Sequence, residues 1–131
     1  MKQFFKDLCE KIVVLDPTIR FVGIANEEGT FEADAERKGL MAIFSPNQRE
    51  EYAITAASRQ STRLRWEYLL GKINYATSHY EKIIRATIPI ADENRRLSHV
   101  VLVSFDPQAK ADEIITKKII PLIGQNMKNF K

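Results

Sequence analysis

The feature that most constrains the fold is a long segment, residues 45–71, with helix signals at both ends. Ser45 is a good amino-terminal cap, Pro46 suits the first helical position, and Gln48 stands where the second side chain of a capping box belongs. Gly71 can end a helix in a left-handed conformation. The segment therefore predicts a helix of about 24 residues, roughly 36 Å long, which would cross a small domain.

One face of this predicted helix consists mostly of small side chains. Placed at helical intervals, the residues on this face or at its edge are Ala53, Ile54, Ala57, Ser61, Leu64 and Tyr68. We expect this face to lie close on a sheet, as the core side of the helix.

A second face combines aromatic and arginine side chains. Its members alternate gaps of four and three residues: Tyr52, Ala56, Arg59, Arg63, Trp66 and Leu70. Such heptad-like spacing is typical of a seam between helices. Two interpretations stay open: a solvated face on which arginine stems cover an aromatic ring, or a protein interface, where Trp, Tyr and Arg dominate binding.

The rest of the chain predicts two more helices and five strands. Residues 2–15 have apolar side chains at helical spacing, and a last helix is expected between Asp106-Pro107 and the breakers Pro121 and Gly124. Strand patterns occur at residues 19–26, 31–36, 73–78, 80–91 and 100–103. The apolar link 39–44 is expected to be a covered connector, and the tail 125–131 to be frayed.

Two of these strands indicate their places in a sheet. The second alternates Phe31, Ala33 and Ala35 with Glu32, Asp34 and Glu36, so one of its faces must be wet, as in an edge strand. It follows the first strand after the short turn Glu27-Glu28-Gly29, which predicts a hairpin. Residues 100–103 are apolar on both faces and predict a central strand.

These elements predict an α+β fold in which one domain spans residues 1–131. Hairpin connections favour a five-stranded antiparallel sheet. If the last strand pairs with the first, the spatial order is 2-1-5-4-3, with the long helix on one face and the amino- and carboxy-terminal helices flanking the sheet.

Composition limits the classes of function without selecting one. The net charge is only +3 over 131 residues, so nucleic-acid binding is permitted but not indicated. The single cysteine, Cys9, cannot form an internal disulfide and fits a reduced, cytoplasmic protein. No apolar run approaches the ~18 residues of a membrane span, so we expect no membrane partner.

No catalytic or metal-binding motif is recognisable. His79 and His99 have no other ligand at metal-binding spacing, and no glycine-rich phosphate loop follows a strand. The carboxylates of Glu32, Asp34 and Glu36 are expected to form a solvated edge. We therefore expect no enzyme, no cofactor and no metal.

The order of elements resembles the roadblock and longin group of profilin-like domains. The resemblance rests on the hairpin 21–35, the helix ending Leu69-Leu70-Gly71, and residues 102–107 running into the last helix. More closely, the chain is similar to a family of small uncharacterised thaumarchaeal proteins, from which it departs at Glu27-Glu28, where a more basic turn is expected. The resemblance to the roadblock group implies that the long helix pairs with its symmetry mate in a homodimer.

These observations favour a non-enzymatic protein-interaction and dimerisation module. Its predicted interface is Tyr52, Arg59, Arg63, Trp66 and Leu70, with Glu51 and Glu67 as acidic partners for the arginines. The resemblance adds a role as regulator or scaffold of a small GTPase. Two alternatives remain: a PAS-like module holding a small molecule beside Ala53, Ala57 and Ser61, and a weak nucleic-acid binder through arginines and lysines that would have to converge.

Overall fold

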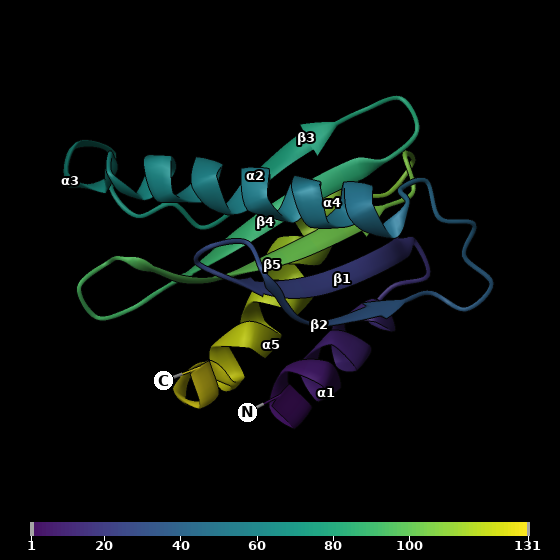
Figure 1. Ribbon diagram of the computed structural model, residues 1–131, viewed down its shortest axis with the longest axis horizontal. Helices are drawn as coiled ribbons and strands as arrows, with labels where there is room; N and C mark the ends of the chain where they lie inside the picture. Colours follow the sequence, from purple (N-terminus) through teal and green to yellow (C-terminus); the bar gives the residue numbers. More distant parts are fainter. Residues whose placement is uncertain (1, 131) are drawn as a thin grey trace.

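The computed structural model describes residues 2–130. It contains a five-stranded antiparallel sheet with helices on both faces (Figure 1). The strands are β1 (Ile19–Asn26), β2 (Phe31–Glu36), β3 (Ala76–His79), β4 (Ile84–Ala91) and β5 (Leu97–Phe105). The helices are α1 (Lys2–Val13), α2 (Pro46–Leu64), α3 (Glu67–Leu70), α4 (Ala111–Ile114), a π-helical segment Ile115–Ile119, α5 (Ile120–Gln125) and a 3-10 helix Met127–Phe130.

The strand order is β2-β1-β5-β4-β3, which confirms the predicted fold class and topology. β5 is central and pairs antiparallel with β1 and β4. Its residues 100–103 are at most 1% exposed, in agreement with their apolar pattern. β2 and β3 are the two edges.

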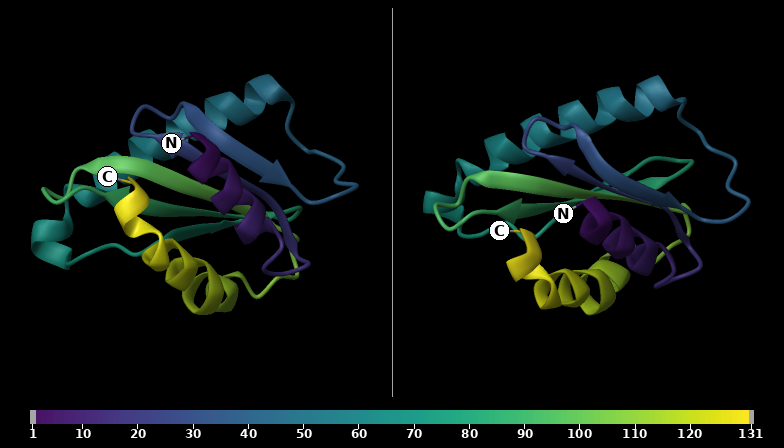
Figure 2. Two further views of the ribbon diagram at one scale, coloured as in Figure 1. Left: turned by 90° about the horizontal axis from the view of Figure 1, so that it is seen from below. Right: turned by 60° about the horizontal axis from the view of Figure 1, so that its bottom comes forward.

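One face of the sheet is covered by the two ends of the chain. α1 and the carboxy-terminal helices lie side by side beneath the sheet (Figure 2), where Phe5, Ile12 and Ile115 pack on Val101, Phe105 and their neighbours. This layer holds most of the apolar core.

α2 packs on the opposite face through its alanines. Ala53, Ala56 and Ala57 are 1–2% exposed and pack on Val100 and Leu102 of β5. The prediction for Ala53, Ala57 and Leu64 is therefore confirmed. It was wrong for Ile54 and Tyr68, which are exposed, and Ala56, placed with the other face, is buried. The buried face also includes the polar Gln60, which points toward β4, so this face is rotated relative to the predicted one.

The long helix is shorter than predicted. The capping box of Ser45 and Gln48 is present, but α2 ends at Leu64 after 19 residues, about 28 Å at 1.5 Å per residue. Arg65 and Trp66 leave the helical hydrogen-bond pattern, and α3 follows, ended by Gly71 with a φ of +86°. Residues 65–71 therefore form a separate short turn of helix.

The predicted alternation of β2 is interrupted by a bulge. Ala33 pairs with Ile24, whereas Phe31 pairs with Ala25, so Glu32 is an extra residue between the two pairs. Phe31 consequently packs on the α2 side, while Ala33 and the buried residue Ala35 pack on the α1 side. The three carboxylates do not form the continuous row that the sequence predicted.

The last helix and the tail also differ from expectation. Asp106-Pro107 forms a turn, and the helix begins at Ala111. It continues past Pro121, which lacks an N–H donor but follows the wider turns of the π-helical segment. Residues 127–130 are helical and not frayed, because Phe130 is buried; residue 131 lies outside the described residues.

Candidate interaction surface

The face of the sheet that carries α2 is only partly covered. α2 packs on β5, β1 and β4, and β3 lies beyond it (Figure 1). β3 pairs with β4 alone among residues 2–130, so the backbone N–H and C=O groups along its outer side form an open edge. We call this uncovered area, which lies beside α2 along β3 (Ala76–His79), the shelf.

The predicted stripe, Tyr52, Arg59, Arg63, Trp66 and Leu70, follows the flank of α2 toward this shelf and continues into α3. Tyr52 is half-buried and lies against Arg85 of β4. The guanidinium of Arg63 reaches the hydroxyl of Thr87 on the same strand, with Nη1 3.5 Å from Oγ1, and Arg59 is exposed. These contacts place the stripe at the boundary between α2 and the uncovered strands.

The apolar end of the stripe is concentrated on α3. The exposed fractions are 52% for Trp66, 79% for Tyr68, 65% for Leu69 and 81% for Leu70; we call these four residues the α3 cluster. The rings of Trp66 and Tyr68 are stacked, with centroids 6.5 Å apart and an angle of 16° between planes. Four adjacent large apolar side chains with this exposure indicate a contact surface.

The α3 cluster is held in place by an ion pair. Glu67 accepts two hydrogen bonds from Arg95, at 3.0 and 2.7 Å, and one from the backbone N–H of Ile73 at 2.9 Å. The bond from Arg95 is the main reason that the pKa of Glu67 is lowered. Glu67 is thus already engaged within its own chain, so it is not the free acidic partner for Arg59 and Arg63 that the sequence suggested.

The basic residues considered for nucleic acid do not converge. Arg95 is paired with Glu67, and Lys117 is paired with Glu113 at 2.9 Å. Lys117 and Lys118 lie on the carboxy-terminal helix, on the face of the sheet opposite α2 (Figure 2). The positive charges are therefore distributed over both faces.

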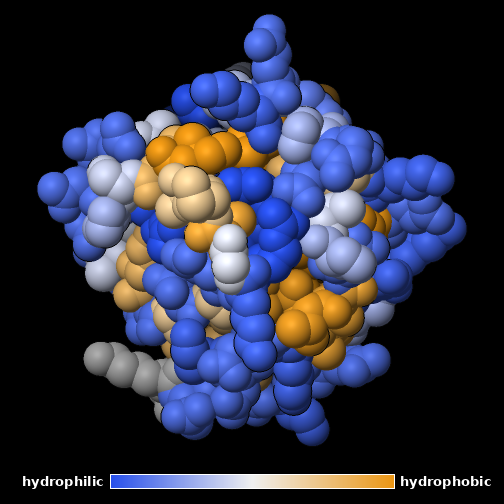
Figure 3. Space-filling model, turned by 90° about the vertical axis from the view of Figure 1, so that its right-hand side faces the viewer, coloured by the Kyte–Doolittle hydropathy of each residue, from blue (hydrophilic) through white to orange (hydrophobic). Residues whose placement is uncertain are grey.

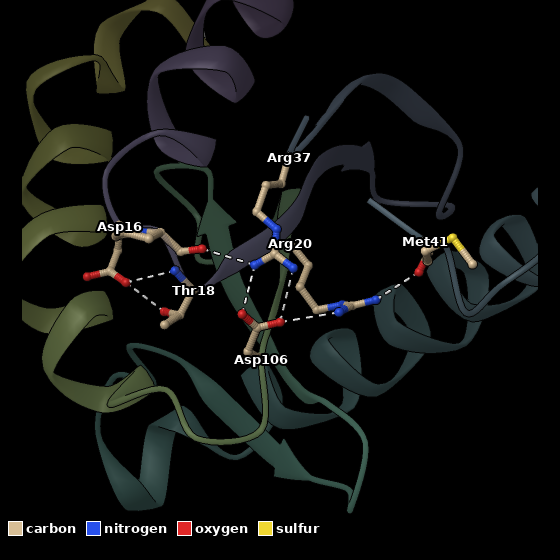
Figure 4. A network of polar contacts seen from close by, with 7 residues as sticks. Asp16, Thr18, Arg20, Arg37, Met41 and Asp106 are labelled. Carbon is tan, nitrogen blue, oxygen red and sulfur yellow. Dashed lines mark hydrogen bonds and ion pairs between the residues drawn. The ribbon is translucent and has the colours of Figure 1, made fainter. Parts of the chain in front are cut away.

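The connector between β2 and α2 is exposed and is tied down by a polar cluster, which corrects the prediction of a covered link. Met41 is 85% exposed. Asp106 accepts hydrogen bonds from Arg37, at 2.8 and 3.2 Å, and from Arg20 at 3.2 Å, and Arg20 also donates to the carbonyl of Met41 (Figure 4). Arg37 and then Arg20 are the main causes of the lowered pKa of Asp106.

The sequence did not single out the polar groups buried beneath α2. Gln60 is fully buried and donates to the carbonyl and hydroxyl of Thr87. Arg85 is only 7% exposed. In β4, Ile84, Ala86 and Ile88 alternate with Arg85 and Thr87, and this pattern does indicate two different faces. A polar face normally indicates contact with solvent, whereas in this fold α2 and the connector cover it.

In the described part of the chain, Cys9 and His99 are isolated from other titratable groups that could act with them in a site. Cys9 is buried, and burial raises its pKa to about 12. His99 packs on Phe5 and Phe130, where burial lowers its pKa. Within residues 2–130 no three His, Cys, Asp or Glu side chains are grouped so as to hold a metal ion, and no helix is long and apolar enough to cross a membrane.

Comparison with solved structures defines the class of fold. The Roadblock/LC7 domain from Streptomyces avermitilis superposes with a TM-score of 0.71 at 10% identity, covering 95% of each chain. MglB in a tetrameric arrangement gives a TM-score of 0.71 at 13% identity, over 95% of this chain and 88% of that one. The gliding protein MglB from Thermus thermophilus gives 0.70 at 12% identity, over 94% and 87%. The chain therefore has the Roadblock/LC7 fold.

The sequence itself places the chain in a family. Residues 2–131 match a family described as "Family of unknown function (DUF6659)", and the protein belongs to it. Comparison with curated proteins finds no match.

Proposed function

We propose that this protein is a non-enzymatic interaction module that forms a homodimer through the flank of α2, the α3 cluster and the open edge of β3. The observation that carries the proposal is the uncovered shelf beside α2, where an unpaired strand edge adjoins exposed aromatic and apolar side chains.

The open edge supports a self-complementary contact. Two copies of β3 related by a two-fold axis run antiparallel, so their edges can exchange backbone hydrogen bonds and join the two sheets. The four residues of β3 are short for an independent pairing. Additional side-chain burial is therefore required, and the helices beside the edge would supply it.

The same axis would bring the two α2 helices together in antiparallel orientation. Tyr52 lies above β4 opposite Ser78 in the strand register, because Tyr52 contacts Arg85 and Arg85 pairs with Ser78. Gln60 lies above Thr87, which pairs with Ala76. A two-fold axis through the middle of β3 thus falls beside the middle of α2, and each α3 cluster would reach the amino-terminal part of the opposite α2.

Arg59 and Arg63 would lie near this axis. Facing arginines repel, and of the two acidic partners that the sequence suggested, the exposed carboxylate of Glu51 is left to offset them, since Glu67 is bound to Arg95. The proposed dimer should therefore be sensitive to salt and to changes in the arginine charge.

The first test is the mass of the protein in solution. Light scattering or sedimentation at concentrations on the order of tens of micromolar should give a dimer, as expected for a contact of about 800 Å² per partner. Trp66→Ala should weaken it at least tenfold if Trp66 is central to the contact. Val14→Ala is the matched control, because Val14 is 78% exposed at the end of α1, away from the shelf. A wild-type monomer would refute the proposal.

A cross-linking scan tests the strand edge separately. Cys9 is buried, so single cysteines introduced at Ala76, Thr77, Ser78 and His79 would be the only reactive thiols. Paired β3 edges should give disulfide-linked dimers most rapidly near the middle of the strand. Glu32→Cys on β2, the other edge, is the control and should remain monomeric under the same oxidant. Equal rates at both edges would indicate random collision.

The finer role as regulator or scaffold of a small GTPase is supported by the resemblance in fold, and one of the similar structures is an MglB tetramer. The regulator role predicts that the dimer binds a small GTPase of the same organism with different affinities in its GDP and GTP states. Equal affinities would leave only a scaffold. An archaeal, cytoplasmic setting is part of the same proposal.

The two alternatives have weaker support. Ala53 and Ala57 pack directly on the sheet, so the space proposed for a ligand beside them is filled by the protein. The basic residues considered for nucleic acid are distributed over both faces, and Arg95 and Lys117 are paired with carboxylates, which disfavours a continuous phosphate-binding track.

A further inference from the structure

Arg85 is a buried cation that lacks an acidic partner. It is 7% exposed, its Nε has no hydrogen-bond partner, and no carboxylate within residues 2–130 forms an ion pair with it. Its guanidinium carbon lies 3.8 Å from the ring centre of Tyr52 and 4.8 Å from that of Phe44. Aromatic faces attract a cation but do not satisfy its N–H donors, so the group is left with unused binding capacity.

Two neighbouring cavities share this arginine. An outer groove of about 540 Å³ is lined by Ile43, Phe44, Tyr52, Tyr80 and Ile83, with Glu81 and Lys82 at its turn. An inner cavity of about 30 Å³ shares Ile43, Phe44, Ile83 and Arg85 with the groove. Both lie at the end of the molecule formed by the connector and the β3–β4 turn, where apolar patches alternate with strongly polar side chains (Figure 3).

The inner cavity is positively charged. Three arginines line it, Arg20, Arg49 and Arg85, together with the buried hydroxyl residue Ser104, and no acidic side chain is among its lining residues. Arg20 is paired with Asp106, and Arg49 with Glu36 at 2.7 Å. Only Arg85 is unpaired, so the inner cavity suits one negative charge.

The sizes of the two cavities restrict the ligand. A volume of about 30 Å³ has room only for a small head group, such as a carboxylate with its single charge. The outer groove is in the size range of small-molecule sites, about 300 to 1,000 Å³, and its aromatic and aliphatic walls suit an apolar body.

We propose that the groove beside Arg85 binds a small amphipathic monocarboxylic acid, with the carboxylate on Arg85 in the inner cavity and the apolar body against Phe44, Tyr52 and Tyr80. The connector forms one wall, and the cluster around Asp106 fixes that wall by holding the carbonyl of Met41. This site adjoins the proposed dimer contact, and Tyr52 borders both.

The test compares three probes on the wild-type protein by calorimetry and by chemical-shift changes of residues 40–52 and 80–85. 3-Phenylpropionate has the acid and the apolar body, 3-phenylpropionamide lacks the charge, and propionate lacks the body. The acid should bind saturably below ~10 mM, and each of the other two should bind at least tenfold more weakly. Equal affinity of acid and amide, or no saturable binding of the acid by that concentration, would overturn the proposal.

Variants locate the site. Arg85→Met keeps most of the side-chain volume and removes the charge, so it should weaken binding of the acid at least tenfold and leave the amide unchanged. Arg59→Met is the control, because it removes an exposed arginine of the neighbouring helix α2. If both variants lower the affinity for the acid equally, the effect is a general charge effect and the assignment to Arg85 is wrong. Phe44→Ala should weaken acid and amide alike.

Discussion

The contact between the β1–β2 turn and α2 can be measured with a series of glycine substitutions. Gly29 lies in the turn with a φ of +88°, and a Cβ added there would be 2.4 Å from Cα of Ile54 and 2.8 Å from the carbonyl oxygen of Ala53. Both are backbone atoms of α2, so neither can move without shifting the helix. Gly29→Ala should therefore strain the turn and displace α2.

Two effects determine how much the free energy of unfolding should fall: the backbone conformation at Gly29 and the steric clash with α2. A left-handed conformation costs an L-residue about 1–2 kcal/mol, partly offset by about 0.4–1 kcal/mol from the less flexible unfolded chain. Overpacking against backbone adds about 1–3 kcal/mol. The free energy of unfolding should thus fall by about 2–4 kcal/mol in total.

Two other glycines separate these terms. Gly39 has a φ of +73° but no atom within 4 Å of an added Cβ, so Gly39→Ala should show the backbone cost alone, about 1 kcal/mol or less. Gly124 lies within α5, has open space around it and no positive φ. Gly124→Ala should raise stability by about 0.5–1 kcal/mol through helix propensity.

Urea denaturation at one fixed protein concentration measures all three, since an oligomer's stability depends on concentration. The reasoning requires the order Gly124→Ala, wild type, Gly39→Ala, Gly29→Ala, from most to least stable. If Gly29→Ala and Gly39→Ala lose the same free energy, the turn does not press on α2, and the close approach of the hairpin to the helix is wrong.

Three further predictions concern titratable groups. Asp106→Asn should lower the free energy of unfolding by about 1–3 kcal/mol at pH 7. Because Arg37 and Arg20 lower the pKa of Asp106, this stabilisation is fully present above the unfolded value of about 3.9 and is lost as pH falls through the lower folded value, so the difference between the urea curves of the two proteins should shrink steadily as pH falls below 4; a difference that does not change with pH would contradict the ion pair. Burial lowers the pKa of His99, so the folded state binds fewer protons than the unfolded state, and stability should fall as pH drops from 7.5 to 5.5; His99→Gln should reduce that slope, and an unchanged slope would show that His99 is not its source. Burial raises the pKa of Cys9 to about 12, so iodoacetamide at pH 8 should modify the thiol only in denaturant, as mass spectrometry would show; rapid modification of the folded protein would contradict the burial.

The sheet was predictable from sequence because each strand carries a signal of its place. The apolar run at 100–103 can only be central, and a hairpin turn joins the first two strands. Together with short connections, these observations leave few topologies, and the order 2-1-5-4-3 followed. The capping box at Ser45 was equally local and was also correct.

The errors arose where one residue changes the register of a periodic pattern. Glu32 is inserted as a bulge, and the segment Ile115–Ile119 takes π-helical spacing. Such insertions keep the composition of an element and shift its faces, so a helical or strand period read along the sequence cannot reveal them. The break after Leu64 was missed for another reason: every residue from 65 to 70 is compatible with a helix, so no local signal marks the end of α2.

The interface residues of the stripe stay a prediction, and one buried group beside them was missed for a different reason. Trp66 and Leu70 are exposed, as an interface requires, and the stripe borders the open edge of the sheet. Arg85 was missed because a charged residue in an alternating strand indicates solvent. Its burial depends on the connector and α2, which are distant in sequence, and no local pattern contains that information.

The dimensions of the two layers give an independent reason to expect a second helix on the shelf. Five strands spaced about 4.8 Å apart make a sheet roughly 20 Å wide, and one helix with its side chains is about 10–12 Å across. α2 can therefore cover little more than half of its face, and it lies over β5 with contacts to β1 on one side and β4 on the other. The opposite face has no such deficit, since α1 and the carboxy-terminal helices lie side by side on it (Figure 2). If two β3 edges pair, the α2 helix of the partner would cover the part of the face that the first α2 leaves open. Substitutions that block the edge should thus separate the protomers and leave the α3 cluster exposed to solvent, and dye binding should rise together with the loss of dimer.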